Sequence, residues 1–121
     1  LEMFTVGAEL AVEKDSYEKF QSEYDIVTNK MISNIEKHID SISKSMKLPP
    51  FFIIPGTSQA SAAIDVARST VRTAERRVVE LMENEQLYNN RVLIYLNRVS
   101  DLLFILGRLE DKDKKAELVK H

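Results

Sequence analysis

The chain has 121 residues, of which 44% are hydrophobic and 30% are charged, with only three glycines and three prolines. This length and composition predict one folded domain over residues 1–121 and exclude a disordered or collagenous chain. The net charge is −2, from 17 basic and 19 acidic residues. It provides no overall positive field that would attract nucleic acid or an anionic membrane, so we expect neither partner.

Several kinds of chemistry are excluded by residue content alone. Cysteine is absent, and histidine occurs only as His38 and His121. Disulfides and thiol nucleophiles are therefore impossible, and a histidine metal site or a Ser-His triad is not expected. No apolar run reaches the roughly 18 residues of a membrane span, and the first residues lack the features of a signal peptide. We expect a cytoplasmic protein, on condition that no targeting segment precedes Leu1.

Helical periodicity begins at the first residue, and one proline-rich segment interrupts it strongly. Apolar residues recur at helical spacing from Leu1 to Ala11 and again, in steps of three and four, from Tyr24 to Met46. The segment LPPFFIIPGTS at 48–58 contains all three prolines and ends this second helix. Thr57 or Ser58 then offers a side-chain oxygen that can cap a third helix.

The third and fourth predicted helices are expected to pack closely. The third should bury a seam of apolar and small residues: Ile64, Ala67, Val71, Ala74, Val78 and Leu81. A polar turn over Glu83–Asn90 leads into the last helix, from Arg91 to Leu109. That helix is apolar around nearly its whole circumference, so it should be buried on more than one side. The fold class predicted is an all-α, up-and-down helical bundle with four helical segments.

A charged stripe accompanies the seam of the third helix. Arg68, Arg72 and Glu75 follow one another at i, i+4 and i+7, with Arg76 beside them. The stripe is either a solvated face with pairs such as Arg72 with Glu75, or a clamp for an anion. Two bidentate guanidiniums on adjacent turns can hold a polyphosphate, and a nearby glutamate can orient Mg²⁺ or an arginine.

A second stripe, on the last helix, also has two interpretations. Asn97, Asp101 and Phe104 share one face at i, i+4 and i+7. In one interpretation, the polar residues form hydrogen bonds to buried neighbours or fix the register of an oligomer. In the other, the face lines a large, mostly apolar ligand pocket or a subunit interface. Phe51 and Phe52 in the proline-flanked linker either fill the core or hold an aromatic ring against a ligand. We expect His38 to lie in solvent.

Taken in order, these segments resemble one family. FIIPGTSQASAAIDVARSTVRTAERRVV at 52–79 and YLNRVSDLLFILGR at 95–108 are similar to the two long motifs of the PduO-type ATP:cob(I)alamin adenosyltransferases. MFTVGAELA at 3–11 resembles the helix that precedes them in that family. The resemblance covers nearly all of positions 3–108. It implies a five-helix bundle whose first helix and N-terminal nucleotide loop would lie before Leu1.

The resemblance also implies an activity and an assembly. The 5′-deoxyadenosyl group of ATP would be transferred to the cobalt of cob(I)alamin, releasing triphosphate. The enzyme would be a homotrimer with active sites at its subunit interfaces, using Mg²⁺ with ATP. Implied partners are a flavin-dependent reductase and an adenosylcobalamin-dependent enzyme. A non-catalytic corrinoid- or nucleotide-binding oligomer of the same fold is the alternative.

Roles are carried over by position onto this sequence. The residues implied for ATP are Arg68, Arg72, Thr73, Glu75, Arg76 and Asn97, with Glu75 on the Mg²⁺ side. Those implied for cobalamin are Phe52, Asn97, Asp101 and Phe104, with Phe52 packing under the corrin and displacing its lower ligand. Two positions depart from the family pattern, since Asp65 stands where histidine is usual and Thr73 where a second consecutive arginine is usual.

Overall fold

The computed structural model describes residues 2–44 and 58–110 of the chain. Along this part run α1 (Glu2–Leu10), the 3-10 helix η1 (Lys14–Ser16), α2 (Tyr17–Glu23), α3 (Asn29–Lys44), α4 (Gln59–Glu83) and α5 (Arg91–Glu110). Helices are the only regular structure in these two ranges, which confirms the all-α prediction. None of the helices described combines the length and apolar character needed to cross a membrane.

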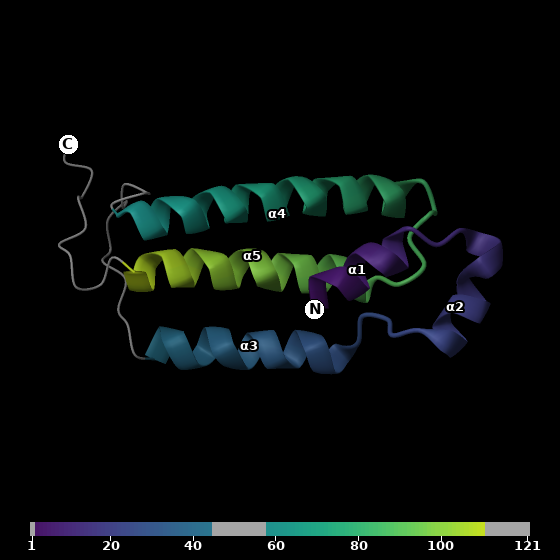
Figure 1. Cartoon of the computed structure of the whole chain (residues 1–121), viewed down its shortest axis with the longest axis horizontal. Coiled ribbons are helices and arrows are strands. Elements are labelled where there is room, and N and C mark those ends of the chain that lie inside the picture. Colours follow the sequence, from purple (N-terminus) through teal and green to yellow (C-terminus); the bar gives the residue numbers. More distant parts are fainter. Residues whose placement is uncertain (1, 45–57, 111–121) are drawn as a thin grey trace.

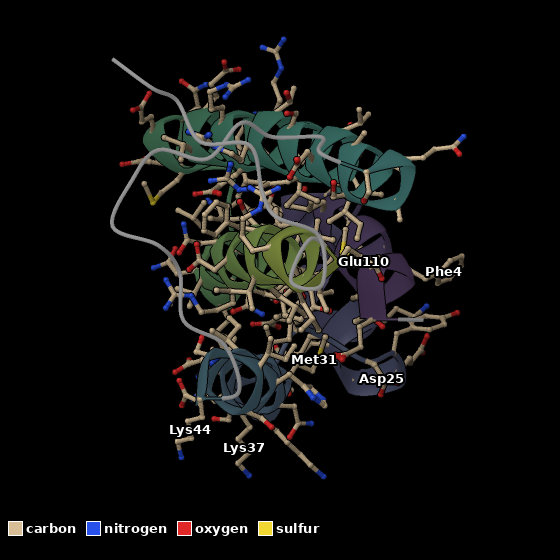
Figure 2. All side chains as sticks on the ribbon, turned by 90° about the vertical axis from the view of Figure 1, so that its left-hand side faces the viewer. Phe4, Asp25, Met31, Lys37, Lys44 and Glu110 are labelled. Atoms are coloured by element: carbon tan, nitrogen blue, oxygen red, sulfur yellow. The ribbon has the colours of Figure 1, made fainter. Side chains whose placement is uncertain are left out.

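The long helices form a row with α5 in the middle. α4 packs along one side of α5 and α3 along the other (Figure 1). The end view shows the same row, with α1 and α2 set to one side of it (Figure 2). The last helix is therefore buried on more than one side, as its sequence predicted, and this explains why few of its positions are polar.

The core is centred on the first half of α5. Val92, Tyr95 and Leu96 are almost fully enclosed, at 0%, 4% and 1% exposure. They meet buried side chains from the other helices and from the segment before α3: Val6, Val27, Ile32, Ile35 and Val78. Removing each such side chain from water stabilises the fold by roughly 1.5–3 kcal/mol. This packing holds α5 rigidly between α3 and α4.

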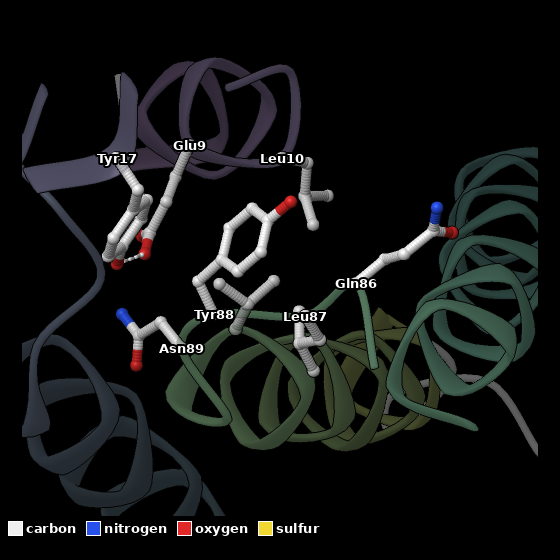
Figure 3. A pocket seen from close by; sticks show the side chains of 8 residues that line it. Glu9, Leu10, Tyr17, Gln86, Leu87, Tyr88 and Asn89 are labelled. Carbon is white, nitrogen blue, oxygen red and sulfur yellow. Dashed lines mark hydrogen bonds between the residues drawn. The ribbon is translucent and has the colours of Figure 1, made fainter. Parts of the chain in front are cut away.

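A buried carboxylate joins α1 to the start of α2 and to the segment before α3, and Asn89 joins that segment to the start of α5 (Figure 3). Glu9 is 3% exposed and accepts hydrogen bonds from Tyr17 Oη at 2.6 Å and from the Val27 backbone N–H at 2.8 Å. Asn89 Nδ2 donates to the Val27 carbonyl at 2.9 Å. Burial, reinforced by the neighbouring Glu9, raises the pKa of Tyr17 well above its ordinary value.

These contacts explain where the helix predicted from Tyr24 differs from the structure. α3 begins at Asn29, and residues 24–28 are not helical. Val27 cannot join the helix because its N–H and C=O groups are used by Glu9 and Asn89. The short helix α2 also lacks a counterpart in the prediction, because seven residues carry too little periodicity to be recognised.

Both ends of α4 are closed by local hydrogen bonds. Ser58 and Ser61 form a capping box, in which each side-chain oxygen accepts from the backbone N–H of the other, at 3.1 and 3.0 Å. This confirms Ser58 as the cap. At the other end Glu85 takes a left-handed conformation with φ 57°, and Gln86 N–H donates to the Leu81 carbonyl at 2.8 Å. Together these form a Schellman-type end.

The buried arc of α4 differs from the predicted seam at one position. Val78 is buried and four other seam residues are half-buried: Ile64, Val71, Ala74 and Leu81. Ala67, however, is exposed, and the enclosed residue at the start of the seam is Ser61. α4 packs chiefly on α5, so its buried arc is narrow. Arg68 and Glu75 lie partly within that arc, which places them against α5.

Candidate functional site

The contact between α4 and α5 brings together residues that the sequence predicted for a common site. Glu75 of α4 faces Asn97 of α5, and Asn97 Nδ2 donates to Glu75 Oε2 at 3.1 Å. Arg68 of α4 lies against Phe104 of α5, with its guanidinium carbon 5.1 Å from the ring centroid. Two predicted nucleotide residues are thus in contact with Phe104, predicted on the corrinoid side, and with Asn97, predicted for both substrates.

A polar chain continues from Glu75 along α5. Arg98 Nη2 donates to Asn97 Oδ1 and forms an ion pair with Asp101 Oδ2 at 3.4 Å. An amide has one donor end and one acceptor end, so a carboxylate on one side and a guanidinium on the other determine its orientation. Asn97 is therefore held with its nitrogen toward α4 and its oxygen toward Arg98.

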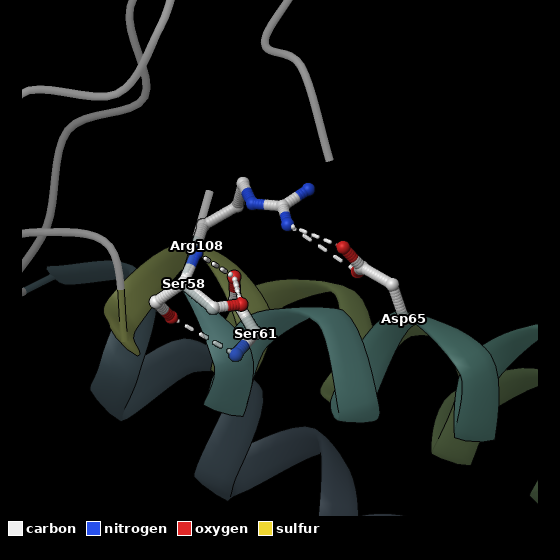
Figure 4. Close-up of polar contacts among 4 residues, drawn as sticks. All are labelled: Ser58, Ser61, Asp65 and Arg108. Carbon is white, nitrogen blue, oxygen red and sulfur yellow. Dashed lines mark hydrogen bonds and ion pairs between the residues drawn. The ribbon is translucent and has the colours of Figure 1, made fainter. Parts of the chain in front are cut away.

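A second cluster lies nearer the end of α5. Arg108 Nη2 donates to both carboxylate oxygens of Asp65, at 2.9 and 3.3 Å (Figure 4). The Arg108 guanidinium carbon is 5.2 Å from the centroid of Phe104, so this ring contacts two arginines. The Nε of Arg68 is buried and has no hydrogen-bond partner among the described residues.

The remaining arginines of the predicted stripe are exposed. Arg72 has no hydrogen bond or ion pair to any residue in the described ranges, so the pair predicted between Arg72 and Glu75 is not formed. Arg76 Nη2 donates to Thr73 Oγ1 at 3.1 Å, and that hydroxyl donates in turn to the Ser69 carbonyl. Arg72 and Arg76 are thus open to a ligand or partner approaching α4 from outside.

Other predicted residues lie elsewhere. Phe51 and Phe52 fall outside the described residues. His38 is exposed on α3, as predicted. Arg98 and Arg108 were not singled out by the sequence, although the i, i+3 spacing of Arg98 and Asp101 was a usable signal. The contact of Arg108 with Asp65 spans 43 positions, so no local pattern could have indicated it.

Glu75 fits a Mg²⁺ ion only together with a ligand. Within residues 2–44 and 58–110 no group of three or more histidine, aspartate or glutamate side chains could hold a metal by itself. Mg²⁺ is commonly bound by one or two carboxylates, substrate phosphates and water. Glu75 Oε2 accepts from Asn97, which leaves Oε1 available for this purpose. A single half-buried carboxylate suits an ion that arrives with a polyphosphate.

The fold and the site together define a class of protein. It is an all-α bundle in which arginines, a glutamate, an oriented amide and an aromatic ring meet at one helix seam, next to exposed arginines. Such a site offers several cationic donors to an anionic ligand. The sequence profile of the cobalamin adenosyltransferase family matches residues 1–110. The chain belongs to this family.

Named relatives agree with this membership. The chain is 36% identical over 110 residues to a corrinoid adenosyltransferase of Bacillus subtilis, which covers 89% of this chain and 52% of that protein. It is 37% identical over 115 residues to the corrinoid adenosyltransferase PduO of Citrobacter freundii, covering 93% of this chain and 32% of that protein. The chain thus spans about half of the first protein and about a third of the second.

Solved structures with the same fold belong to a Lactobacillus reuteri PduO-type adenosyltransferase. A variant of that protein complexed with ATP has a TM-score of 0.79 and 30% identity, covering 98% of this chain and 63% of that one. Another variant, complexed with cobalamin and ATP, also has a TM-score of 0.79, with 31% identity and coverages of 98% and 64%. The bundle predicted from the sequence is therefore the fold of this family.

Proposed function

We propose that this protein transfers the 5′-deoxyadenosyl group of ATP to cob(I)alamin, giving adenosylcobalamin and triphosphate. Family membership supports the proposal, as do related proteins named for this activity and related structures that hold ATP and cobalamin. One observation carries it for this chain. Arg68 and Glu75, which are predicted for the nucleotide, touch Phe104, predicted for the corrinoid, and Asn97, predicted for both substrates.

The proposed reaction needs no nucleophile from the protein. The cobalt of cob(I)alamin donates its electron pair to C5′ of ATP, and the C5′–O bond breaks with its electrons passing to triphosphate. The protein positions the two substrates and neutralises the charge that develops on the leaving group. We assign this neutralisation to Arg68, Arg72 and Arg76, with Glu75 on the Mg²⁺ side and Thr73 beside the phosphates. The exposed side chain of Arg72, which has no hydrogen bond or ion pair to a described residue, supports this assignment.

The corrinoid side is assigned to α5 and to the linker before α4. Asp101 and Phe104 would line it, and Asn97 would sit where nucleotide and corrinoid meet. The orientation of Asn97 between Glu75 and Arg98 supports that placement. Phe52 would pack under the corrin and displace the lower axial ligand. The cobalt would then be four-coordinate and easier to reduce.

We further propose a homotrimer with its active sites between subunits. The exposed side of α4 supports this, since Val66 is 67% exposed and Ala67 beside it is also exposed, next to the exposed Arg72. Exposed apolar residues beside an arginine that has no ion pair among the described residues are suited to burial against a second copy. A flavin-dependent reductase, an adenosylcobalamin-dependent enzyme, a cytoplasmic location and a single domain over residues 1–121 stay predictions.

An anaerobic absorption spectrum of the full-length protein with Mg-ATP and chemically reduced cobalamin tests the activity. We expect conversion to the spectrum of adenosylcobalamin, with release of triphosphate rather than diphosphate. Binding of ATP or cobalamin without formation of the Co–C bond would favour the non-catalytic alternative. Failure to bind either would show that only the fold is shared with the family.

Arg72→Ala tests the nucleotide side. Removing one cation from the developing triphosphate should lower kcat/KM by about 100-fold or more, a loss typical of a single charge-stabilising group. The fold should be unaffected, because Arg72 is exposed and contacts no described partner. The matched control is Arg77→Ala on the same helix, whose side chain is 72% exposed and pairs with Glu80. Undiminished turnover by Arg72→Ala would refute the assignment.

A further inference from the structure

The ion pair between Asp65 and Arg108 lies out of solvent between α4 and α5. The side chains of Arg108 and Asp65 are 5% and 20% exposed, and Arg108 Nη2 reaches both carboxylate oxygens of Asp65 (Figure 4). Two opposite charges withdrawn from water in this way attract each other with little screening, and each would be costly to bury alone. Asp65 therefore helps to hold Arg108 in position.

Arg108 also contacts the ring of Phe104. Its guanidinium carbon is 5.2 Å from the ring centroid, and that of Arg68 is 5.1 Å from the same centroid. The negative face of an aromatic ring attracts a cation, but two guanidiniums at one ring repel each other. The carboxylate of Asp65 balances this repulsion by holding Arg108. Asp65, Arg108 and Phe104 thus form a connected chain that ends at the ring.

Gly107 shows how closely the Asp65 carboxylate is seated against α5. A Cβ atom at this glycine would lie 3.1 Å from Asp65 Oδ1 and 3.6 Å from Ile64 Cγ2. The carboxylate therefore rests against the backbone of α5 and has little room to move toward that helix. Even a methyl group at Gly107 would displace it by a few tenths of an ångström, without changing any charge.

We propose that Asp65 is a positioning residue for the corrinoid side of the site, acting through Arg108 to hold the ring of Phe104 in place. The inference rests on the proposed function, which gives Phe104 a corrinoid to contact. A ring that is already held in position loses less conformational freedom when the corrinoid binds. Holding Phe104 in place therefore raises the affinity for the corrinoid. On the nucleotide side, Arg72, Glu75 and Arg76 are reached by none of these contacts, whereas Arg68 touches the chain at the ring of Phe104.

The test separates the two substrates kinetically. In the full-length protein, Asp65→Asn keeps the shape of the side chain and removes its charge. We expect the KM for cob(I)alamin to rise about tenfold and the KM for ATP to rise by a smaller factor, because Arg68 touches the same ring from the nucleotide side. The matched control is Glu80→Gln on the same helix, which makes the same charge change in an exposed pair. Gly107→Ala should raise the corrinoid KM in the same direction while keeping the ion pair's charges.

A double-mutant cycle tests whether the effect passes through the ring. In a Phe104→Leu background, Asp65→Asn should raise the corrinoid KM no further, because the ring it positions is gone. Additive effects, or equal changes in both KM values, would overturn the positioning role while leaving the activity established. The free energy of unfolding, measured for the same cycle, reports the coupling of Asp65 with Phe104 without any substrate. An unmodified protein that binds no corrinoid would overturn the proposed function and this role together.

Discussion

Glu9 offers the clearest test of how the bundle is held together. This carboxylate is 3% exposed and accepts two hydrogen bonds, from Tyr17 Oη at 2.6 Å and from the Val27 backbone N–H at 2.8 Å. Glu9→Ala removes both and leaves two donors without their acceptor. Hydrogen bonds to a charged group contribute roughly 1.5–3 kcal/mol each, so the loss should be about 3–6 kcal/mol. That is a large part of the total stability of a domain.

Glu9→Gln refines the prediction. The amide oxygen can still accept from Val27 N–H, and the Tyr17 hydroxyl can turn to accept from the amide nitrogen. Only the charge assistance is lost, so the destabilisation should be about 1–2 kcal/mol. Glu36→Ala serves as the control, because Glu36 is an exposed glutamate on α3. Its effect should stay within about 0.5 kcal/mol.

Urea denaturation followed by circular dichroism measures all three variants on one scale. The expected order of destabilisation is Glu9→Ala, then Glu9→Gln, then Glu36→Ala. If Glu9→Ala were no more destabilising than the control, the carboxylate would not be joining α1 to the segment before α3, and the reasoning would be refuted. An equal loss in Glu9→Ala and Glu9→Gln would instead show that charge, not hydrogen bonding, is what matters.

Three further outcomes can be checked by the same method. Ser58→Ala removes half of the capping box with Ser61 and should cost about 1 kcal/mol, and Ser58→Gly should cost less; equal values would argue against the cap. Glu85→Gly relieves a left-handed non-glycine residue and should stabilise by about 0.5–1 kcal/mol, visible as a higher midpoint at unchanged slope. Burial, with the charge of Glu2, raises the pKa of Tyr95 from 10.0 to about 12. The folded state therefore favours the protonated phenol. The contribution of Tyr95 to the free energy of unfolding is complete below pH 10 and is lost as the pH rises toward 12. Tyr95→Phe should flatten that decline in stability.

Much of the fold could be read from local pattern. The cap at Ser58 and the last helix from Arg91 were predicted because each depends on residues adjacent in the chain or one helical turn apart. The predictions were wrong where a distant group intervened. Val27 is not helical because Glu9 and Asn89 use its backbone groups, and neither lies near it in sequence.

The candidate site, too, was predictable from the sequence only in part. Spacing along each helix placed Arg68 with Glu75 and Asn97 with Phe104, since i, i+4 and i+7 positions share a face. Which residue of one helix meets which residue of the other was decided only when α4 packed against α5. That packing chose Asn97 rather than Arg72 as the partner of Glu75.

The sequence by itself determined that this chain is a helical bundle with an arginine stripe and a polar stripe on separate helices. Tertiary structure alone decided that the stripes meet, that Asp65 pairs with Arg108, and that Glu9 is buried. The physical reason is one of range. Backbone periodicity and caps act over one or two turns, whereas the partner of a buried charge is set by the relative position of two packed helices, to which residues throughout the core contribute.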